Sequence, residues 1–488
     1  MKNESLGMLL SFLFVIALFS SSCKEQEELV GALAVSSLDV LPAPEGDSTE
    51  VTITCDSKWT ATVNNTVPWI TIVGSTAGEA GAANLKLRFS SNGTGATRNG
   101  IVTIKSPNGQ ARRIKISQIN MYFPSYNISP KAPDATGMGS TAMELAAKMH
   151  LGINIGNTFE APGNEQGWGS PIITEDWIKA VKQHGFNAIR IPVQWNWHHQ
   201  ADSMKAKIDP AWLTRIHQVV KYCTDNDMYV FINIHWDGGW MENNCTPAKK
   251  DSVAARTKAF WEQIATKMRD FDEHLMFANA NEPNTKNVEE MKVLLYYHKT
   301  FINAVRSTGG RNTYRCLILQ GTSELLHAAD FPHDPTPNRL MFEEHNYTPF
   351  QFTLMRDGNA SWGKMFYYWG VNNHSTIEPD RNPNWDCEET AQAQGFDRLK
   401  REFIDKGIPV MLGEYGAYRR NGHPLYEPKE LELHNKSVDH WIKFTTNAAV
   451  TRGIVPFWWD TGGLIRRNNG FTVGDQRSLD KLKEGAVK

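Results

Sequence analysis

The segment "LMFANANEP", residues 275–283, sets out a pattern that recurs along most of the chain. A short apolar run ends abruptly in polar residues, here the amide of Asn281 and the carboxylate of Glu282. Short apolar runs of this kind are typical of strands buried on both faces of a sheet. Seven further runs follow the same pattern: "GINIGN" (152–157), "AIRIPVQW" (188–195), "YVFINIHW" (229–236), "RCLILQG" (315–321), "LMFEEHNYTP" (340–349), "PVMLGEYG" (409–416) and "IVPFWWDTGG" (454–463).

Segments with helical periodicity fill the intervals between these eight runs. "TEDWIKAVKQHGF" begins with Thr174 as a predicted N-cap, and "DPAWLTRIHQVVKYCTDND" begins with Asp209 as N-cap and Pro210 in the first turn. Eight strands that alternate with helices predict an α/β fold, a (β/α)8 TIM barrel over residues 141–488. A doubly wound open sheet is the alternative, but six strands are more usual there and no Gly-x-Gly-x-x-Gly follows any run.

Residues 33–120 have a different rhythm, with apolar and polar residues alternating in short runs such as "STEVTITC" and "RRIKISQI". Turn signals such as "APEGD" and "SSNGTGATRNG" separate these runs, which predicts an N-terminal all-β sandwich. Trp59, "PWITI" with Trp69, "SSNGTGATRNGIVTI" and "ISQI" resemble the BACON domain, an immunoglobulin-like module that is often fused to secreted carbohydrate-active enzymes. The segment 121–140, rich in Pro, Ser and Gly, is the predicted linker to the barrel.

The role of this sandwich has two interpretations. If it binds carbohydrate or mucin, its aromatic side chains should be exposed on one face. If it is a spacer, Trp59 and Trp69 should lie in its core. We favour the spacer, because a tryptophan in an alternating strand is more often packed than exposed.

The first 22 residues are predicted to be a signal peptide. Lys2 precedes the apolar run "MLLSFLFVIALF", which is too short to span a bilayer as a mature helix and is followed by "SSSC". This resembles a lipoprotein signal, so we expect a lipidated Cys23 at the start of a polar tether, residues 23–32. The protein would then be secreted and anchored to the outer membrane or cell surface only through this lipid, with a plain secretory signal as the alternative.

Composition limits the classes of function. The 488 residues carry 51 basic and 53 acidic side chains, so the basic patch of a nucleic-acid binder is not expected. Sixteen tryptophans exceed what a core of this size needs, and tryptophan suits half-wet faces such as those that bind sugar rings or proteins. The cysteines are too scattered for a disulfide framework or a zinc site, although one bridge is left open among Cys55, Cys223, Cys245, Cys316 and Cys387.

Polar side chains at the ends of the predicted strands indicate the site. In a TIM barrel the carboxyl ends of the strands meet around one pocket, so these side chains should share it. Two carboxylates among Arg, His, Tyr and Trp, without metal-ligand spacing, are typical of glycoside hydrolysis. The strand-end residues are Arg190, His235, Asn281, Glu282, His345, Tyr347, Glu414, Trp458 and Trp459.

Six strand motifs resemble glycoside hydrolase family 5 of clan A over residues 145–470. They are "IRIPV", "INIHW", "NEPN", "HNYTP", "GEYG" and "FWWDTGG", in the family's order, and "GINIGNTFEA" resembles the endoglucanase and xyloglucanase branch. The resemblance implies a retaining enzyme without a cofactor, in which Glu282 is the acid/base and Glu414 the nucleophile. It also implies that Tyr347 donates a hydrogen bond to Glu414 and that the charge of Arg190 keeps Glu414 ionised.

The same resemblance implies the remaining contacts with the sugar. Asn281 would bond the 2-hydroxyl, His235 and His345 would line the subsite, and Trp459 would be the floor beneath the ring, with Trp458 as the other candidate. We also expect the charge of Glu414 to raise the pKa of Glu282. His198 and His199 are expected to be exposed loop residues.

The loops predict an open cleft for a polymer. Residues 350–389 carry five aromatic residues that could stack on sugars, although any one of them could instead pack the loop onto the barrel. We expect a monomeric endo-β-1,4-glucanase that acts on plant cell-wall β-glucans, including xyloglucan and mixed-linkage glucan. The alternatives are an endo-β-mannanase with the same catalytic pair, a non-catalytic glycan-binding protein, and a metal-dependent barrel hydrolase. The last would need a His/Asp cluster such as His-x-His at the first strand, which this sequence does not have. The five aromatic residues of 350–389 that could stack on sugars are Trp362, Tyr367, Tyr368, Trp369 and Trp385, and Trp240 lies in the loop after the third strand.

Overall fold

The computed structural model describes residues 33–487, apart from 45, 65–66, 93, 95 and 357–359. The predicted signal peptide, Cys23 and the tether lie outside the described residues. The chain divides between Tyr122 and Phe123 into two compact units. The predicted linker is cut by this boundary, and its part from Phe123 onward docks on the second unit, where Glu262 Oε2 accepts from the backbone N–H of Tyr126 at 2.6 Å.

The first unit is a sandwich of two sheets. Along β3, every second residue points into the core, as the alternation in the sequence predicts. Trp59 and Trp69 lie in this core, 3% and 9% exposed, which favours a packing role over a sugar platform. One sheet has the order β1 (Leu33–Val35), β3 (Ser48–Cys55), β7 (Gly81–Phe89) and β5 (Ile70–Val73), and the other has β2 (Asp39–Val40), β9 (Ala111–Gln118), β8 (Arg98–Lys105), β4 (Trp59–Val63) and β6 (Ala77–Gly78).

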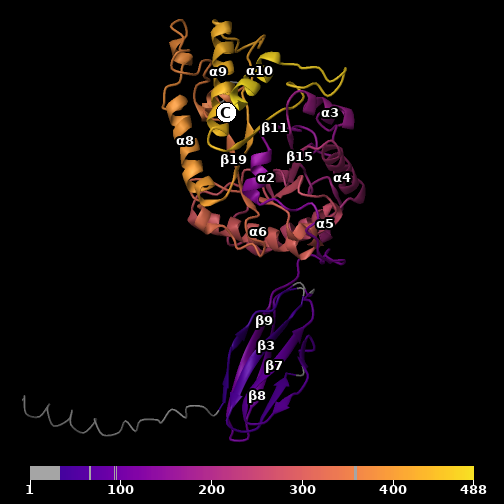
Figure 1. Ribbon diagram of the computed structural model, residues 1–488. Helices are drawn as coiled ribbons and strands as arrows, with labels where there is room; N and C mark the ends of the chain where they lie inside the picture. The colour runs from indigo at the N-terminus through magenta and orange to yellow at the C-terminus, as the bar shows by residue number, and fades with distance from the viewer. Residues whose placement is uncertain are drawn as a thin grey trace, which may run out of the picture. The chain divides into compact units, whose positions relative to one another are not determined.

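The second unit is a closed barrel of eight strands, which confirms the predicted (β/α)8 fold (Figure 1). Each of the eight apolar runs forms one strand, and all neighbouring pairs are parallel. In order around the barrel, the strands are β11 (Gly152–Asn154), β12 (Ala188–Ile191), β15 (Tyr229–Asn233), β16 (Leu275–Ala278), β18 (Leu317–Gln320), β19 (Leu340–Asn346), β20 (Val410–Tyr415) and β21 (Val455–Trp458).

Helices surround the barrel and begin at the predicted caps. The Thr174 side chain accepts from the backbone N–H of Trp177, and that of Asp209 accepts from Ala211, so each satisfies a free amide in the first turn. The connection from β18 to β19 differs, because a 3-10 turn, η4 (Ala328–Asp330), stands where a helix was expected. The outer helices are α3 (Glu175–Gln183), α4 (Pro210–Asp225), α5 (Lys250–Met268), α6 (Val288–Ser307), α8 (Glu389–Glu402), α9 (Leu431–Val450) and α10 (Gln476–Ala486).

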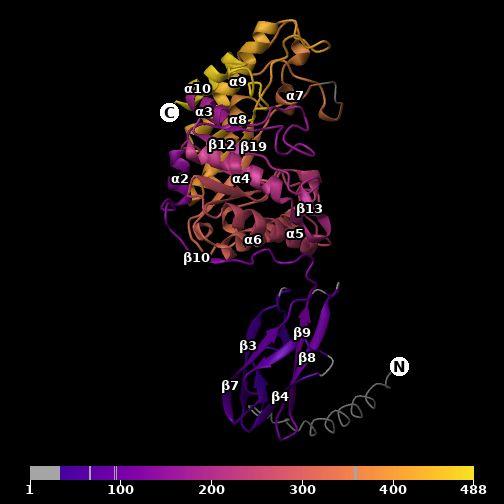
Figure 2. The same cartoon turned by 90° about the vertical axis from the view of Figure 1, so that its right-hand side faces the viewer.

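Helix α2 (Ala142–Lys148) closes one end of the barrel. Its buried Leu145 packs with interior side chains of the strands, including Phe231 and Phe457, and so blocks access from the amino ends of the strands. In Figure 2, α2 lies on one side of the barrel unit, and α7 (Phe350–Thr353) and β13 (Gln200–Asp202), which follow strands, lie on the other. The open end is therefore the end where the strand-end polar residues gather.

Shorter elements complete the described chain. None of its helices combines the length and the apolar character needed to cross a bilayer. All five described cysteines are buried and none is joined to another, so the bridge left open by the sequence does not form among them. The short elements are β10 (Lys131–Pro133), which pairs with β17 (Gly309–Gly310), β14 (Lys207–Ile208), η1 (Ser203–Lys205), η2 (Asp237–Gly239), η3 (Arg311–Thr313), η5 (Ala360–Trp362), η6 (Pro379–Arg381) and η7 (Ile404–Lys406).

Candidate active site

Glu414 lies on β20 at the open end of the barrel, and its carboxylate is held by two donors. Arg190 of β12 reaches across with Nη1 at 2.8 Å from Glu414 Oε1. The hydroxyl of Tyr347, just beyond β19, donates to Glu414 Oε2 at 3.0 Å. Both donors are buried, so the carboxylate is fixed in one orientation, which a nucleophile that must face an anomeric carbon needs.

Arg190 connects the strands beneath the site. Its Nη2 donates to Asn281 Oδ1 at 2.7 Å, and its Nη1 also donates to Asn154 Oδ1 on β11 at 3.1 Å. Its Nε lies 2.8 Å from Glu343 Oε1 on β19. One fully buried guanidinium therefore sets the positions of both Glu414 and Asn281, the residue before Glu282.

Glu282 lies just beyond β16, in a strained turn. Its φ is +48°, a left-handed conformation that a residue with a side chain rarely adopts, and a proline follows it. Gln320 of β18 holds this turn, because its Oε1 accepts from the Glu282 backbone N–H at 2.6 Å. The side chain, 51% exposed, faces a hollow of about 410 Å³ that Trp236, Thr322 and His345 also line.

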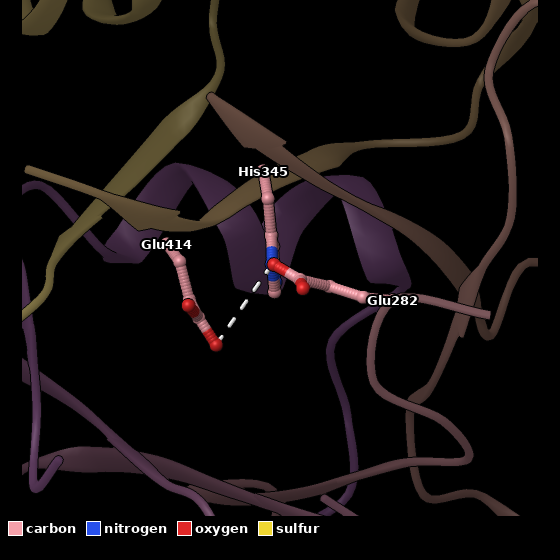
Figure 3. Close-up of side chains that lie close together, drawn as sticks. All are labelled: Glu282, His345 and Glu414. Atoms are coloured by element: carbon pink, nitrogen blue, oxygen red, sulfur yellow. Dashed lines mark hydrogen bonds and ion pairs between the residues drawn. The ribbon is translucent and has the colours of Figure 1, made fainter. Parts of the chain in front are cut away.

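The His345 ring lies between the two carboxylates (Figure 3). Its Nδ1 is 2.8 Å from Glu282 Oε1 and 3.8 Å from Glu414 Oε1, and its Nε2 is 3.0 Å from Glu343 Oε1. One oxygen of each of Glu282 and Glu414 and a ring nitrogen of His345 lie within 4.8 Å of one another. That separation suits the pair of a retaining glycosidase, about 5–5.5 Å apart, and is too short for the 6.5–9.5 Å of an inverting one.

The side chains of Glu282, His345 and Glu414 could also be considered as metal ligands. Burial favours a neutral His345 ring, but the charge of Glu414 and the bonds to Glu282 and Glu343 outweigh it and raise its pKa to about 10. A metal would have to displace a proton from this ring before the ring could bind it. The side chains as they stand are arranged for proton transfer.

The pKa directions of the two carboxyl groups are opposite to those expected. Burial favours a protonated Glu282, but the hydrogen bond and charge of His345, with Arg190, outweigh it and lower its pKa. Burial raises the pKa of Glu414, even though His345 and Arg190 oppose this. Glu414 is buried and feels the charge of Glu282, whereas Glu282 is half exposed and lies a full ångström closer to His345.

His235 and Trp459 form one wall of the site. Their rings stack at 6.0 Å with an interplanar angle of 13°. Trp459 is partly exposed, whereas Trp458 is buried and packs edge-on against Tyr415 in the core. The structure therefore places Trp459, and not its neighbour, where a sugar ring could lie on it.

The aromatic residues of the loops divide into two groups. Trp362 and Trp385 are exposed, but Tyr367, Tyr368, Trp369 and Trp240 are buried and pack the loops onto the barrel. His199 is also buried, against the expectation of an exposed loop residue, and stacks on Trp212 at 3.8 Å, whereas His198 is exposed. The exposed tryptophans of the described chain are Trp168, Trp197, Trp236, Trp362 and Trp385.

Sequence reasoning missed three residues of the site, Asn154, Gln320 and Glu343. Each lies at or near the carboxyl end of a barrel strand and bonds a predicted site residue. Glu343 carried a signal, because it is two residues from His345 and so on the same face of the strand. Asn154 and Gln320 had no signal beyond being polar residues at the ends of apolar runs.

Comparisons with known proteins agree with this geometry. Residues 153–464 match the model of the cellulase family, glycosyl hydrolase family 5. The xyloglucan-specific endo-β-1,4-glucanase BoGH5A of Bacteroides ovatus is 32% identical over 477 residues, 92% of this chain and 91% of that protein. Endoglucanase A of Ruminococcus albus is 32% identical over 357 residues, 69% of this chain and 88% of that one.

Two solved structures extend the comparison. A Bacteroides ovatus GH5 xyloglucanase in complex with a XXXG heptasaccharide has a TM-score of 0.67 and 30% identity, and the match covers 93% of this chain and all of that one. XEG5B, a GH5 xyloglucan-specific β-1,4-glucanase from a ruminal metagenomic library, has a TM-score of 0.64 and 34% identity, with 71% of this chain and 96% of that one covered. The chain belongs to the cellulase family, glycosyl hydrolase family 5, and is a glycoside hydrolase.

Proposed function

We propose that the protein is a retaining endo-β-1,4-glucanase that acts on β-glucans of the plant cell wall, xyloglucan among them. The observation that carries the proposal is the pair of carboxyl groups, Glu282 and Glu414, whose oxygens approach within 4.8 Å across the barrel mouth. The names of the relatives support β-1,4-glucans, and xyloglucan in particular, as substrates.

The first step forms a covalent glycosyl-enzyme. The Glu414 carboxylate attacks the anomeric carbon, and the bond from that carbon to the glycosidic oxygen breaks. The proton of Glu282 passes to this oxygen, which leaves as the hydroxyl of the departing chain. Tyr347 and Arg190 hold Glu414 on the attacking line, and Asn281, fixed by Arg190, is placed to bond the sugar beside it.

The second step returns the enzyme to its starting state. A water molecule attacks the anomeric carbon, its proton passes to the now ionised Glu282, and the ester bond to Glu414 breaks. Two inversions give overall retention of configuration. The same Glu282 therefore acts first as acid and then as base.

The exposed tryptophans support action within a long chain. Trp168, Trp197 and Trp236 follow β11, β12 and β15, whereas Trp362 and Trp385 follow β19, so they stand on loops around the mouth and not in one closed pocket. Sugar rings stack on such half-wet aromatic faces. An open row of platforms suits internal cleavage of a polymer.

The test is hydrolysis of a polymer panel: xyloglucan, barley β-glucan, carboxymethylcellulose, glucomannan and mannan. We expect oligosaccharide release from a β-glucan at a rate at least about tenfold above that from mannan, because a site that bonds one sugar configuration discriminates against its epimer. Proton NMR of the early products should show the β-anomer first. A preference for mannan would mean that the protein is a mannanase. Release of the α-anomer first would overturn retention, and no hydrolysis of any polymer would favour a non-catalytic glycan-binding protein.

We further propose that the chain is exported and held at the cell surface by a lipid on Cys23. The support is the sequence "SSSC" after an apolar run. Cys23→Ser is expected to move the protein from the membrane fraction to the soluble fraction and to abolish labelling with palmitate. A variant that stays in the membrane fraction would contradict the anchor.

A further inference from the structure

Glu343 is a buried carboxylate that the two-step reaction does not use. Its side chain is fully buried on β19. One oxygen, Oε1, lies 2.8 Å from Arg190 Nε and 3.0 Å from His345 Nε2. Burying a carboxylate costs free energy unless its partners compensate, so both cations are needed to keep this one charged.

The barrel wall is shaped to hold this carboxylate. A Cβ atom built on Gly413 of β20 would clash with the Glu343 carboxyl group, so a side chain before Glu414 would displace this carboxylate. The pairing of β19 with β20 also shifts between Glu344 and His345, which places His345 opposite Glu414. The site is therefore built around three carboxylates and not two.

The charges of the cluster explain what a third carboxylate does. Hydrolysis needs a protonated Glu282 and an ionised Glu414. With Arg190 and His345 both charged, this state is neutral only if Glu343 is ionised. Without Glu343, the buried cluster would carry a net positive charge, which favours loss of the proton from His345.

A neutral His345 would compete for the proton of the acid. Its Nδ1 lies 2.8 Å from Glu282 Oε1, within reach of a proton on that carboxyl group. A ring that already carries both protons can only donate to Glu282. The charged and titratable groups that act on this ring are Arg190 of β12, His235 after β15, Glu282 after β16, Glu343 and Glu344 of β19, Tyr347 beyond it, and Glu414 of β20.

We propose that Glu343 is a positioning residue that keeps the His345 ring doubly protonated throughout the reaction, so that the proton on Glu282 passes only to the glycosidic oxygen. This inference rests on the proposed function. It assigns to Glu343 a role in proton control, in addition to its contact with Arg190.

The test is Glu343→Gln, which keeps the volume and removes the charge. For a cello-oligosaccharide, whose leaving group needs the proton, kcat/KM at pH 7 should fall at least about tenfold, and the basic limb of its pH profile should move down by about one unit. For 2,4-dinitrophenyl β-cellotrioside, whose leaving group needs no proton, kcat/KM should stay within about threefold. A merely structural role would lower both values equally.

The matched control is Glu389→Gln, the same change in a carboxyl group of α8 that pairs with His440 at 2.7 Å and bonds none of the site residues. This variant should keep the wild-type basic limb. Nitrogen-15 NMR of His345 gives a readout without turnover. We expect both ring nitrogens to stay protonated from pH 5 to 8 in the wild type and the ring to titrate in Glu343→Gln.

Three results would overturn the inference. They are a neutral His345 in the wild type at pH 7, an unchanged basic limb in Glu343→Gln, and equal losses on the two substrates. A neutral His345 in the wild type would overturn the inference even if Glu343→Gln does not fold. Failure of the proposed function would look different, because the wild type would then cleave neither the oligosaccharide nor the aryl glycoside.

Discussion

Replacing Glu414 with alanine is expected to lower kcat about a thousandfold or more on every β-glucan and on 2,4-dinitrophenyl β-cellotrioside alike. No other described carboxylate can take its place, because Glu343 is fully buried beneath the site and Glu282 stands on the leaving-group side. A good leaving group cannot help, since the lost group is the one that forms the bond. Initial rates on both substrates measure the effect.

Azide identifies the role of the lost carboxylate. It should enter the space vacated by Glu414, attack the activated aryl glycoside in a single displacement and give the α-glycosyl azide, which NMR distinguishes from the β form. Glu389→Gln is the control, since this carboxyl group of α8 pairs with His440 at 2.7 Å and bonds none of the site residues. If Glu414→Ala keeps more than a tenth of the wild-type rate, or gives the β-azide, Glu414 is not the nucleophile.

The barrel could be predicted because its signals are local. Each apolar run is short, buried along its whole length and followed by a segment with helical period, and Thr174 and Asp209 cap their helices as their positions in the sequence predict. The turn η4 stands in place of an expected helix. A helix between β18 and β19 is expected only from the alternation of strands and helices, and Pro332, Pro335 and Pro337 in that segment disfavour it.

The site could be predicted as a set of residues but not as a charge network. The predicted strand-end side chains lie at the open end, because strand ends fix position, except that of Trp458, which packs edge-on against Tyr415 in the core. The pKa directions depend on how deeply each carboxyl group is buried and on how far it lies from His345, which no motif encodes. Burial of Tyr367, Tyr368 and Trp369 likewise depends on how a long loop folds back, and the sequence alone gave no preference for any of these rings.

The directions of the Glu282 and Glu414 pKa shifts bear on which carboxyl group carries the catalytic proton. Glu282 and Glu414 are close enough to titrate as a pair, so the pKa values seen in kinetics belong to the pair. Burial raises the pKa of Glu414, whereas the hydrogen bond and charge of His345 outweigh burial and lower the pKa of Glu282. A bound chain would cover the exposed half of Glu282, and this loss of water favours its protonated form.

Replacing Glu282 with alanine is expected to separate substrates by leaving group. For a β-glucan or cello-oligosaccharide, kcat/KM should fall about a thousandfold, because the departing hydroxyl is no longer protonated. For 2,4-dinitrophenyl β-cellotrioside, kcat/KM should stay within about tenfold, but kcat should fall because no base activates the water that releases the glycosyl-enzyme. Stopped-flow release of dinitrophenol should therefore show a burst.

Azide again assigns the role, with the opposite product. In Glu282→Ala it should attack the glycosyl-enzyme on Glu414 in place of water, restore kcat on the aryl glycoside and give the β-glycosyl azide, because two inversions have occurred. Glu389→Gln serves again as the control, because its carboxyl group bonds none of the site residues. Equal losses on both substrates, or an α-azide from this variant, would mean that Glu282 is not the acid/base. The two alanine variants together therefore fix both roles, because only a nucleophile and an acid/base on opposite sides of one anomeric carbon give azides of opposite configuration.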